Sequence, residues 1–273
     1  MSTPFKLDHL AIGVERWADA YPRFAVELGG RWSHGGGAGE FWPYQLTYRD
    51  DMHLEFISPG DSVDGFMRRF IDRSGCGPHH ITFKVPSLDR ALEEVGGLGL
   101  SILGGRTTMD FWQEAFLHPK LAGVGTLIQI AQIDEEAMDR MKIGARRPAD
   151  FPERAGPQRG LSWIGLSVES LDRAKELFAG VLRGDIVEEG LGWARLSWGP
   201  SRGLLLRDET GVPGHPELWR REPVPGVAHV MFGPADLSVD EVAGKRADAV
   251  PLPRDPLTGT PVWTVDHLAT TDR

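Results

Sequence analysis

The chain has 273 residues, of which 41% are hydrophobic and 25% are charged, so it is long enough to form two ordinary domains with buried cores. Its 30 basic and 39 acidic residues give a net charge of -9, which argues against a partner that is bound through nucleic-acid phosphates. No apolar run approaches the length that spans a bilayer, and no secretory signal stands at the start, so we expect no membrane partner and a cytoplasmic location. The single cysteine, Cys76, fits a reducing compartment.

The first half of the sequence repeats one pattern of secondary structure. Residues 6–14 alternate as a strand does, and residues 17–28 carry apolar side chains at helical spacing. Three strand-like runs follow, around residue 32 and at residues 41–49 and 52–58. After an amphipathic piece, the order begins again with a strand at 80–85, a helix at 88–95 and later strands at 112–118 and 126–131. Each unit is therefore βαβββ.

The second half contains the same unit again. A charged, proline-bearing stretch at residues 133–159 predicts a linker between two domains, residues 1–132 and 160–273. After it, the segment SLDRA of residues 87–91 occurs again at residues 170–174. The strand LSWIGLSV at residues 161–168 follows the strand at 80–85 at the same spacing, so the chain has an internal repeat. A fourth copy begins at residues 226–232. The sequence therefore predicts an α+β protein built from tandem paired βαβββ modules, two domains in one chain.

Strand alternation in the first domain places one polar donor in each of four strands. These donors are His9, Glu55, His80 and Gln129, each among small or apolar neighbours of equal parity. Two imidazoles, one carboxylate and one amide oxygen suit one divalent cation, such as zinc, manganese, iron, cobalt or nickel. The alternative is satisfied core or edge histidines and a solvated Glu55. Equivalent positions in two repeats favour the metal site, because packing gives no reason for an imidazole at both.

The motifs around these residues resemble those of the vicinal oxygen chelate superfamily, which includes glyoxalase I and bleomycin resistance proteins. Between residues 7 and 132, the segments LDHLAIGV, HLEFISPGD, GPHHITFKV and AFLHPKLAGVGTLIQIAQ are most similar to the methylmalonyl-CoA epimerase branch. The resemblance implies paired modules that close a cupped sheet around one metal ion. It makes His9, Glu55, His80 and Gln129 the ligand set, with His80 rather than His79 because HITFKV aligns with HLAIGV.

One position departs from the family's pattern. The last strand of the family usually supplies a glutamate that binds the metal and often acts as base, whereas Gln129 stands there in this chain. An amide oxygen can bind a metal but cannot accept a proton near neutral pH. The base must therefore be another group, and four candidates stay open: Glu55, Glu40, His53 and Glu114.

The second domain keeps the module pattern and loses the donors. Trp163, Leu205 and Trp263 stand at three of the four donor positions, and only His229 persists. We expect a degenerate copy that serves packing or forms a lid, with His229 in a structural role. Alternatively, its tryptophans line an apolar pocket. Because single-domain relatives typically pair, this half can replace a partner subunit, and we expect a monomer or a homodimer.

Three functions are compatible with these features. The first is a metal-dependent isomerase, epimerase or lyase that acts on a small keto, hydroxy-acid or thioester substrate through an enolate or enediolate. The second is a ferrous ring-cleaving dioxygenase, since two histidines and one carboxylate form the facial set of such iron sites. Two-domain dioxygenases of the family, however, usually hold the metal in the second half and take the carboxylate from the final strand. The third is a non-catalytic binding protein similar to the drug-sequestering members.

Overall fold

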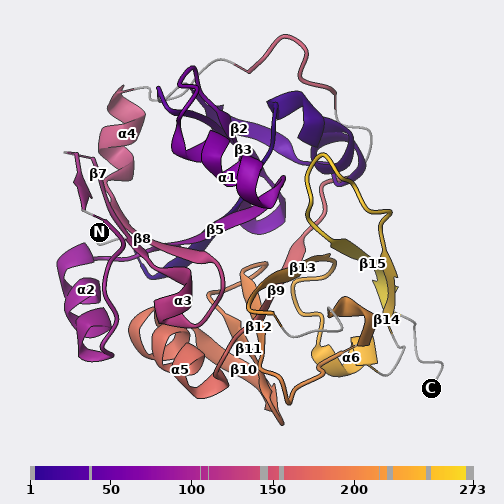
Figure 1. Ribbon diagram of the computed structural model, residues 1–273. Helices are drawn as coiled ribbons and strands as arrows, with labels where there is room; N and C mark the ends of the chain where they lie inside the picture. The colour runs from indigo at the N-terminus through magenta and orange to yellow at the C-terminus, as the bar shows by residue number, and fades with distance from the viewer. Residues whose placement is uncertain are drawn as a thin grey trace.

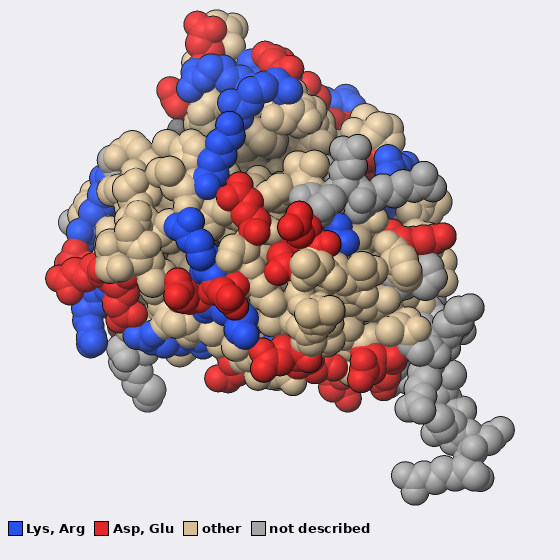
Figure 2. All heavy atoms as spheres, turned by 60° about the horizontal axis from the view of Figure 1, so that its bottom comes forward, with Lys and Arg blue, Asp and Glu red and all other residues tan. Residues whose placement is uncertain are grey.

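The computed structural model describes residues 4–36, 39–104, 106–109, 111–141, 147–153, 157–214, 216–219, 224–243 and 247–268. Within these residues the strands form two mixed sheets, one in each half of the chain. Figure 1 shows the first half, indigo to pink, beside and above the second half, orange to yellow. None of the described helices is both long and apolar enough to cross a membrane. On the face in Figure 2, basic and acidic side chains are interspersed and form no single basic surface.

The first sheet contains both modules of the first half. In the described part of the chain it has the strand order β2-β3-β4-β1-β5-β8-β7-β6. The strands are β1 (Lys6–Gly13), β2 (Arg31–Gly35), β3 (Phe41–Thr47), β4 (His53–Pro59), β5 (Gly77–Lys84), β6 (Thr107–Thr108), β7 (Trp112–Leu117) and β8 (Leu127–Ile133). The first strands of the two modules, β1 and β5, run antiparallel at the centre, and each lies parallel to the last strand of its own module. The modules are thus related by a pseudo-twofold axis between β1 and β5.

The second sheet repeats this arrangement. Its described strands have the order β10-β11-β12-β9-β13-β15-β14. They are β9 (Leu161–Ser167), β10 (Asp185–Gly190), β11 (Trp193–Ser197), β12 (Gly203–Arg207), β13 (Gly226–Phe232), β14 (Ala247–Pro251) and β15 (Val262–Leu268). Here β9 and β13 are the antiparallel central pair, flanked by the parallel strands β12 and β15. The predicted fold class, α+β with tandem paired modules in two domains, is confirmed.

Short helical segments connect these strands. The α-helices are α1 (Phe66–Ser74), α2 (Leu88–Gly97), α3 (Pro119–Ala122), α4 (Glu135–Met141), α5 (Leu171–Lys175) and α6 (Val239–Ala243). The remaining segments are η1 (Trp17–Ala20), η2 (Tyr21–Glu27), η3 (Arg49–Asp51), η4 (Glu176–Val181) and η5 (Pro216–Leu218). The SLDRA repeat has a structural cause, because Ser87 and Ser170 both cap a helix by accepting a hydrogen bond from the third residue onward.

The single helix expected at residues 17–28 is wrong in detail. The chain instead forms a tight 3-10 turn, η1, followed directly by a π-helix, η2. Pro22 lies in the first turn of η2 and has no backbone N–H to donate, and at the other end Leu28 bonds back to Arg23 at 3.0 Å, across five residues rather than four. Helical spacing of apolar residues predicts a buried helical face but does not distinguish these pitches.

The predicted linker at residues 133–159 is in part regular structure. It begins at the last residue of β8 and contains α4, whereas residues 142–146 and 154–156 lie outside the described residues. Phe151 packs edge-on against Tyr21 and Trp32, with ring centroids 5.1 and 5.8 Å apart. The domain boundaries at 132 and 160 stay a prediction.

The two halves share one hydrophobic core. Phe83 of β5 contacts Phe178 and Trp198 of the second half, at centroid distances of 5.6 and 5.0 Å. Tyr48 meets Phe232 in the same way at 5.1 Å. A continuous cluster of buried side chains therefore joins the faces of both sheets, so that each half is stabilised by burial against the other.

Side chains fill the position in the second sheet that corresponds to the polar donors of the first. Gly165 pairs with Leu205 and His229, as Ala11 pairs with Glu55 and His80. A Cβ on Gly165 would lie 2.1 Å from the His229 ring, so glycine is required there. Trp163 donates its indole N–H to Nε2 of His229 at 3.0 Å, and the two residues are fully buried.

The burial of His229 predicts a loss of stability in acid. Burial lowers the pKa of His229 to about 3, so the folded protein keeps it neutral while the unfolded chain protonates it below its ordinary pKa of 6.5. The free energy of unfolding therefore falls as the pH drops from 6.5 toward 3, by about 2 kcal/mol between pH 7 and pH 5 from this residue.

Urea unfolding of His229→Gln at pH 7 and pH 5 checks this expectation. Glutamine can still accept the bond from Trp163 but does not titrate, so the variant loses about 2 kcal/mol of the difference between the two pH values. Equal pH dependence in His229→Gln and the parent contradicts the prediction.

Candidate metal centre

The four predicted donors lie on four adjacent strands at the middle of the first sheet. His9 is on β1, Glu55 on β4, His80 on β5 and Gln129 on β8. The strand register brings them together, because Ala11 pairs with both Glu55 and His80, while its counterpart Thr82 pairs with both His9 and Gln129. The pseudo-twofold axis thus relates His9 to His80 and Glu55 to Gln129.

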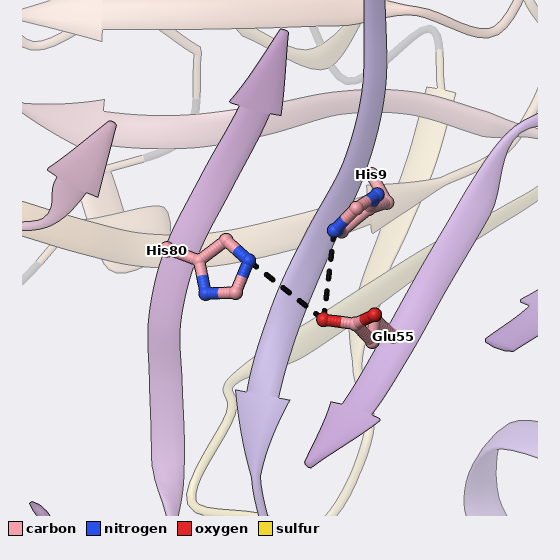
Figure 3. Close-up of side chains that lie close together, drawn as sticks. All are labelled: His9, Glu55 and His80. Carbon is pink, nitrogen blue, oxygen red and sulfur yellow. Dashed lines mark ion pairs between the residues drawn. The ribbon is translucent and has the colours of Figure 1, made fainter. Parts of the chain in front are cut away.

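Three of the donors converge on one point, as Figure 3 shows. One carboxylate oxygen of Glu55, Oε2, lies 3.6 Å from Nε2 of His9 and 3.7 Å from Nε2 of His80. The three ligand atoms all lie within 4.8 Å of one another. Both histidines are buried, and the Glu55 side chain is only 13% exposed. One divalent ion can contact all three groups at this spacing.

His80 carries the observation that best fits a metal. Its Nε2 is buried, faces Glu55 and has no hydrogen-bond partner. Burial and the neighbouring His79 hold the pKa of His80 well below its usual value, so the ring is neutral. A buried imidazole nitrogen without a hydrogen-bond partner is unusual in a folded protein, and the neutral ring can offer its lone pair to a metal ion at this point.

Charge at the centre also favours a cation. Burial alone would lower the pKa of His9, but the carboxylates of Glu55 and Asp8 outweigh it and raise the pKa to about 9. Burial alone would raise the pKa of Glu55, but His9 and His80 outweigh it and lower the pKa to about 2. The two carboxylates therefore keep the imidazole of His9 protonated, and a divalent ion that binds here would take the place of this proton as the positive charge.

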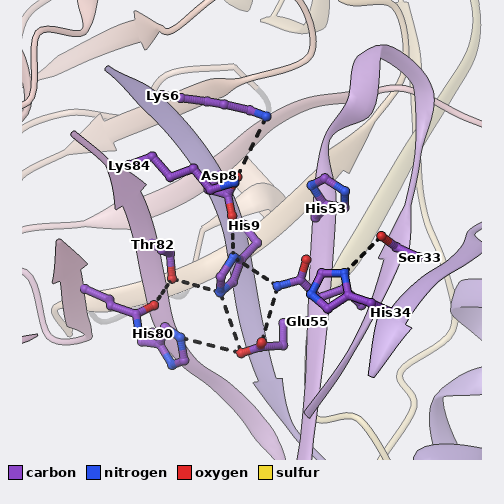
Figure 4. Close-up of polar contacts among 12 residues, drawn as sticks. Lys6, Asp8, His9, Ser33, His34, His53, Glu55, His80, Thr82 and Lys84 are labelled. Carbon is purple, nitrogen blue, oxygen red and sulfur yellow. Dashed lines mark hydrogen bonds and ion pairs between the residues drawn. The ribbon is translucent and has the colours of Figure 1, made fainter. Parts of the chain in front are cut away.

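Asp8 holds His9 in place through a β-bulge. Leu7 pairs with Phe83 and His9 pairs with Thr82, so Asp8 is the extra residue between two successive pairs. The bulge brings the Asp8 carboxylate beside its neighbour, with Oδ2 2.9 Å from Nδ1 of His9 (Figure 4). This contact turns Nε2 of His9 toward Glu55. Strict alternation would place Asp8 on the opposite face, so sequence reasoning missed it.

Lys84 balances the charge of Asp8. Its Nζ lies 3.0 Å from Oδ1 of Asp8, which is only 3% exposed. Burial would raise the pKa of Asp8, but the hydrogen bond with His9 and the charge of Lys84 hold it well below its usual value. Asp8 is therefore a permanent anion behind His9, the arrangement that commonly fixes the ring of a metal-binding histidine.

His79 performs the corresponding role behind His80. The two Nδ1 atoms are 2.8 Å apart, and a metal ion bound to Nε2 of His80 would make Nδ1 of His80 the donor of this bond. The ring of His79 packs against Phe66 and Phe70, at centroid distances of 5.9 and 4.7 Å. Burial lowers the pKa of His79 to about 4, with Arg73 adding to the effect, so it stays a neutral acceptor.

The side-chain amide of Gln129 accepts one hydrogen bond and donates another. Its Oε1 accepts from the hydroxyl of Thr82, which also lies 2.8 Å from Nε2 of His9. Its Nε2 donates to the carboxylate of Glu114, which in turn accepts the indole N–H of Trp112 at 2.6 Å. The amide oxygen therefore faces the centre, and Glu114 is fixed at the edge of the site.

Gln45 is a second residue that sequence reasoning missed. It lies on β3 directly opposite Glu55 and donates to Oε1 of that carboxylate at 3.3 Å. This bond engages one oxygen and leaves Oε2 directed at the two histidines. Strand alternation places Gln45 on the face of β3 that carries the site, but only the β3–β4 register shows that Glu55 is its partner.

The structure separates the four predicted base candidates. Glu55 and Glu114 line the cavity above the centre, whereas Glu40 and His53 do not. Glu40 is exposed at the outer end of β3. His53 lies two residues before Glu55, about 7 Å along the strand, and its Nε2 is 3.6 Å from Asp51. Position therefore favours Glu55 and Glu114 over Glu40 and His53, because strand parity does not fix position along the sheet, and the identity of the base stays a prediction.

A cavity of about 790 Å³ opens over the donors. His9, Glu55, His80 and Gln129 lie in its wall, and its apolar lining includes Phe41, Phe66, Phe70, Phe111, Trp112 and Phe116. This size and mixture of one polar centre with aromatic walls are typical of a small-molecule site.

Removing the charge of Asp8 tests the support of His9. We expect Asp8→Asn to weaken the binding of a divalent ion about 10- to 100-fold, because the neutral amide no longer fixes and polarises the imidazole. Competition with a chromophoric chelator measures the affinity. Asp72→Asn, at an exposed position of α1, is the control with unchanged affinity. An unchanged affinity in a folded Asp8→Asn protein excludes this role.

A scan against protein-family models found no match, and a search of curated proteins found no relative. Among solved structures, a hypothetical protein from Staphylococcus aureus matches 96% of this chain and 99% of its own length, with a TM-score of 0.59 and 10% identity. A hypothetical protein from Bacillus halodurans and methylmalonyl-CoA epimerase from Mycobacterium tuberculosis match 48% and 49% of this chain. They match 96% and 91% of their own lengths, with 25% and 21% identity and a TM-score of 0.44 for both. The full-length match establishes likeness of fold over both halves of the chain.

Proposed function

We propose that this chain is a metal-dependent enzyme that moves a proton on a small molecule with two adjacent oxygens, as an isomerase, epimerase or lyase. The observation that carries the proposal is the unpartnered, buried Nε2 of His80, which faces Glu55 and His9 at the wall of an apolar cavity. In this proposal His9, Glu55 and His80 hold one divalent ion, and Oε1 of Gln129 is a fourth donor.

The donor set is compatible with zinc, manganese, iron, cobalt or nickel. Such an ion, when bound, supplies a Lewis acid that polarises a carbonyl oxygen and so acidifies the neighbouring C–H bond. The protein prepares this centre in advance. Asp8 and His79 fix the two imidazoles from behind, and Gln45 fixes the carboxylate of Glu55.

Glu114 is the group that we propose to accept the proton. Among the described residues of the cavity wall, it is the carboxylate outside the ligand set, and Trp112 and Gln129 hold it at the edge of the centre. Gln129 cannot accept the proton because it is an amide. Glu114 would take a proton from the carbon beside the carbonyl, leave the electron pair in the enolate and then return the proton. The aromatic side chains of the wall give this exchange an apolar surrounding.

Metal content tests the ligand assignment. We expect purified protein, loaded with a divalent ion and freed of excess, to retain about one ion per chain. His80→Ala should lose it, because His9, Glu55 and the amide of Gln129 bind an ion far more weakly than these three together with His80. His229→Gln changes the equivalent position of the second sheet and keeps the ion. Elemental analysis decides, and unchanged metal content in His80→Ala refutes the assignment.

Exchange of substrate protons with solvent tests Glu114. We expect metal-loaded protein to introduce deuterium beside the carbonyl of at least one compound in a panel of keto acids, hydroxy acids and acyl thioesters in D₂O, followed by NMR. Glu114→Gln should lower this rate about 10²- to 10⁴-fold while it keeps the metal.

Full exchange in Glu114→Gln contradicts its role as base.

The three donors His9, Glu55 and His80 also form the two-histidine, one-carboxylate set of ferrous oxygenases. Oxygen uptake by iron-loaded protein with catechols, without any proton exchange, would therefore replace the isomerase proposal with a dioxygenase.

A further inference from the structure

Two arginines line the cavity from helix α1. Arg69 and Arg73 are four residues apart, so their side chains lie on the same side of the helix. The acidic side chains of the described lining are Glu55 and Glu114, which belong to the metal centre and its edge, and His9 of that centre has a raised pKa. The rim of the cavity therefore carries two guanidinium groups that the proposed chemistry does not use.

No carboxylate in the described part of the chain neutralises these two arginines. Arg69 donates to the backbone carbonyl of Asp64, which positions the guanidinium and leaves its charge in place. The adjacent Arg68 provides a contrast, because it pairs with both Glu15 and Asp72, each at 2.7 Å. In a chain with a net charge of -9, carboxylates are abundant, so two unpaired guanidiniums beside an apolar cavity favour an acidic ligand.

Arg73 is also close to the metal centre. Its charge acts on His79, and His79 is hydrogen-bonded to His80. Phe66 and Phe70 of the same helix also line this wall, and both rings pack against His79. The lining therefore suits a molecule that combines an acidic group, an apolar part and a chelating group.

We propose that Arg69 and Arg73 bind the carboxylate or phosphate group of an anionic substrate, whose apolar body fills the cavity and whose two adjacent oxygens reach His9, Glu55 and His80. The last clause rests on the proposed function, whereas recognition of the acidic group by the arginines does not. Guanidinium groups suit this task because they present paired donors to carboxylate and phosphate oxygens.

Binding to metal-free protein tests the arginines separately from the metal. The probes are 3-phenylpropionate, phenyl phosphate and the uncharged 3-phenylpropionamide, titrated in the presence of a chelator and followed by the fluorescence of the tryptophans, among them Trp112 in the cavity wall. We expect at least one acid to bind about tenfold more tightly than the amide, and the preferred acid identifies carboxylate or phosphate as the recognised group.

The double variant Arg69→Gln/Arg73→Gln should bind that acid no more tightly than the amide. Arg68→Gln, on the same helix but paired outside the cavity, keeps the preference. Equal binding of acid and amide by the parent, failure of both acids to bind, or an acid preference that survives in the double variant overturns the proposal. Loss of the metal in all preparations would refute the proposed function and leave this result intact.

Discussion

The cluster of ion pairs around the central strands β1 and β5 is the constraint on which the arrangement of the first sheet depends. A largely buried Glu55 and a buried Asp8 are costly to remove from water unless positive charge accompanies them. His9 lies between these carboxylates, and Lys84 balances Asp8 from the far side. The strand register, the bulge at Asp8 and the bond from Gln45 all keep these charges paired.

Duplication explains why the two modules place polar side chains at equivalent positions, although the chemistry of these side chains differs. The pseudo-twofold axis gives each module a histidine on its first strand, and it gives one module Glu55 where the other has Gln129. The second pair of modules keeps the register, including a bulge at Ser162 between Leu161 and Trp163. There, bulky Trp163 and Leu205 replace the donors, and close contact between Gly165 and His229 fills the space. Packed side chains therefore take the place of the polar donors without a change of fold.

Two features determine where charged and apolar groups lie around the cavity. The amide of Gln129 lies between the carboxylate of Glu114 and the three converging donors, and in the proposed centre this carboxylate is a neighbour rather than a ligand. Helix α1 adds cations at the rim and phenyl rings on the wall. A molecule that satisfies all three regions must combine chelating, apolar and acidic parts, which narrows the candidate substrates more than the metal centre does alone.

Alternation and repetition in the sequence were sufficient to predict the α+β fold, its four modules and the four donors that the structure brings together, because strand period and internal similarity are local properties. They were insufficient for Asp8, which faces the site only because a bulge interrupts the alternation, and for Gln45, whose partner depends on the β3–β4 register. They also gave no means of ranking Glu40, His53 and Glu114, since parity defines a face but not a distance. The tertiary structure decided these points because each depends on pairing between strands that are far apart in the chain.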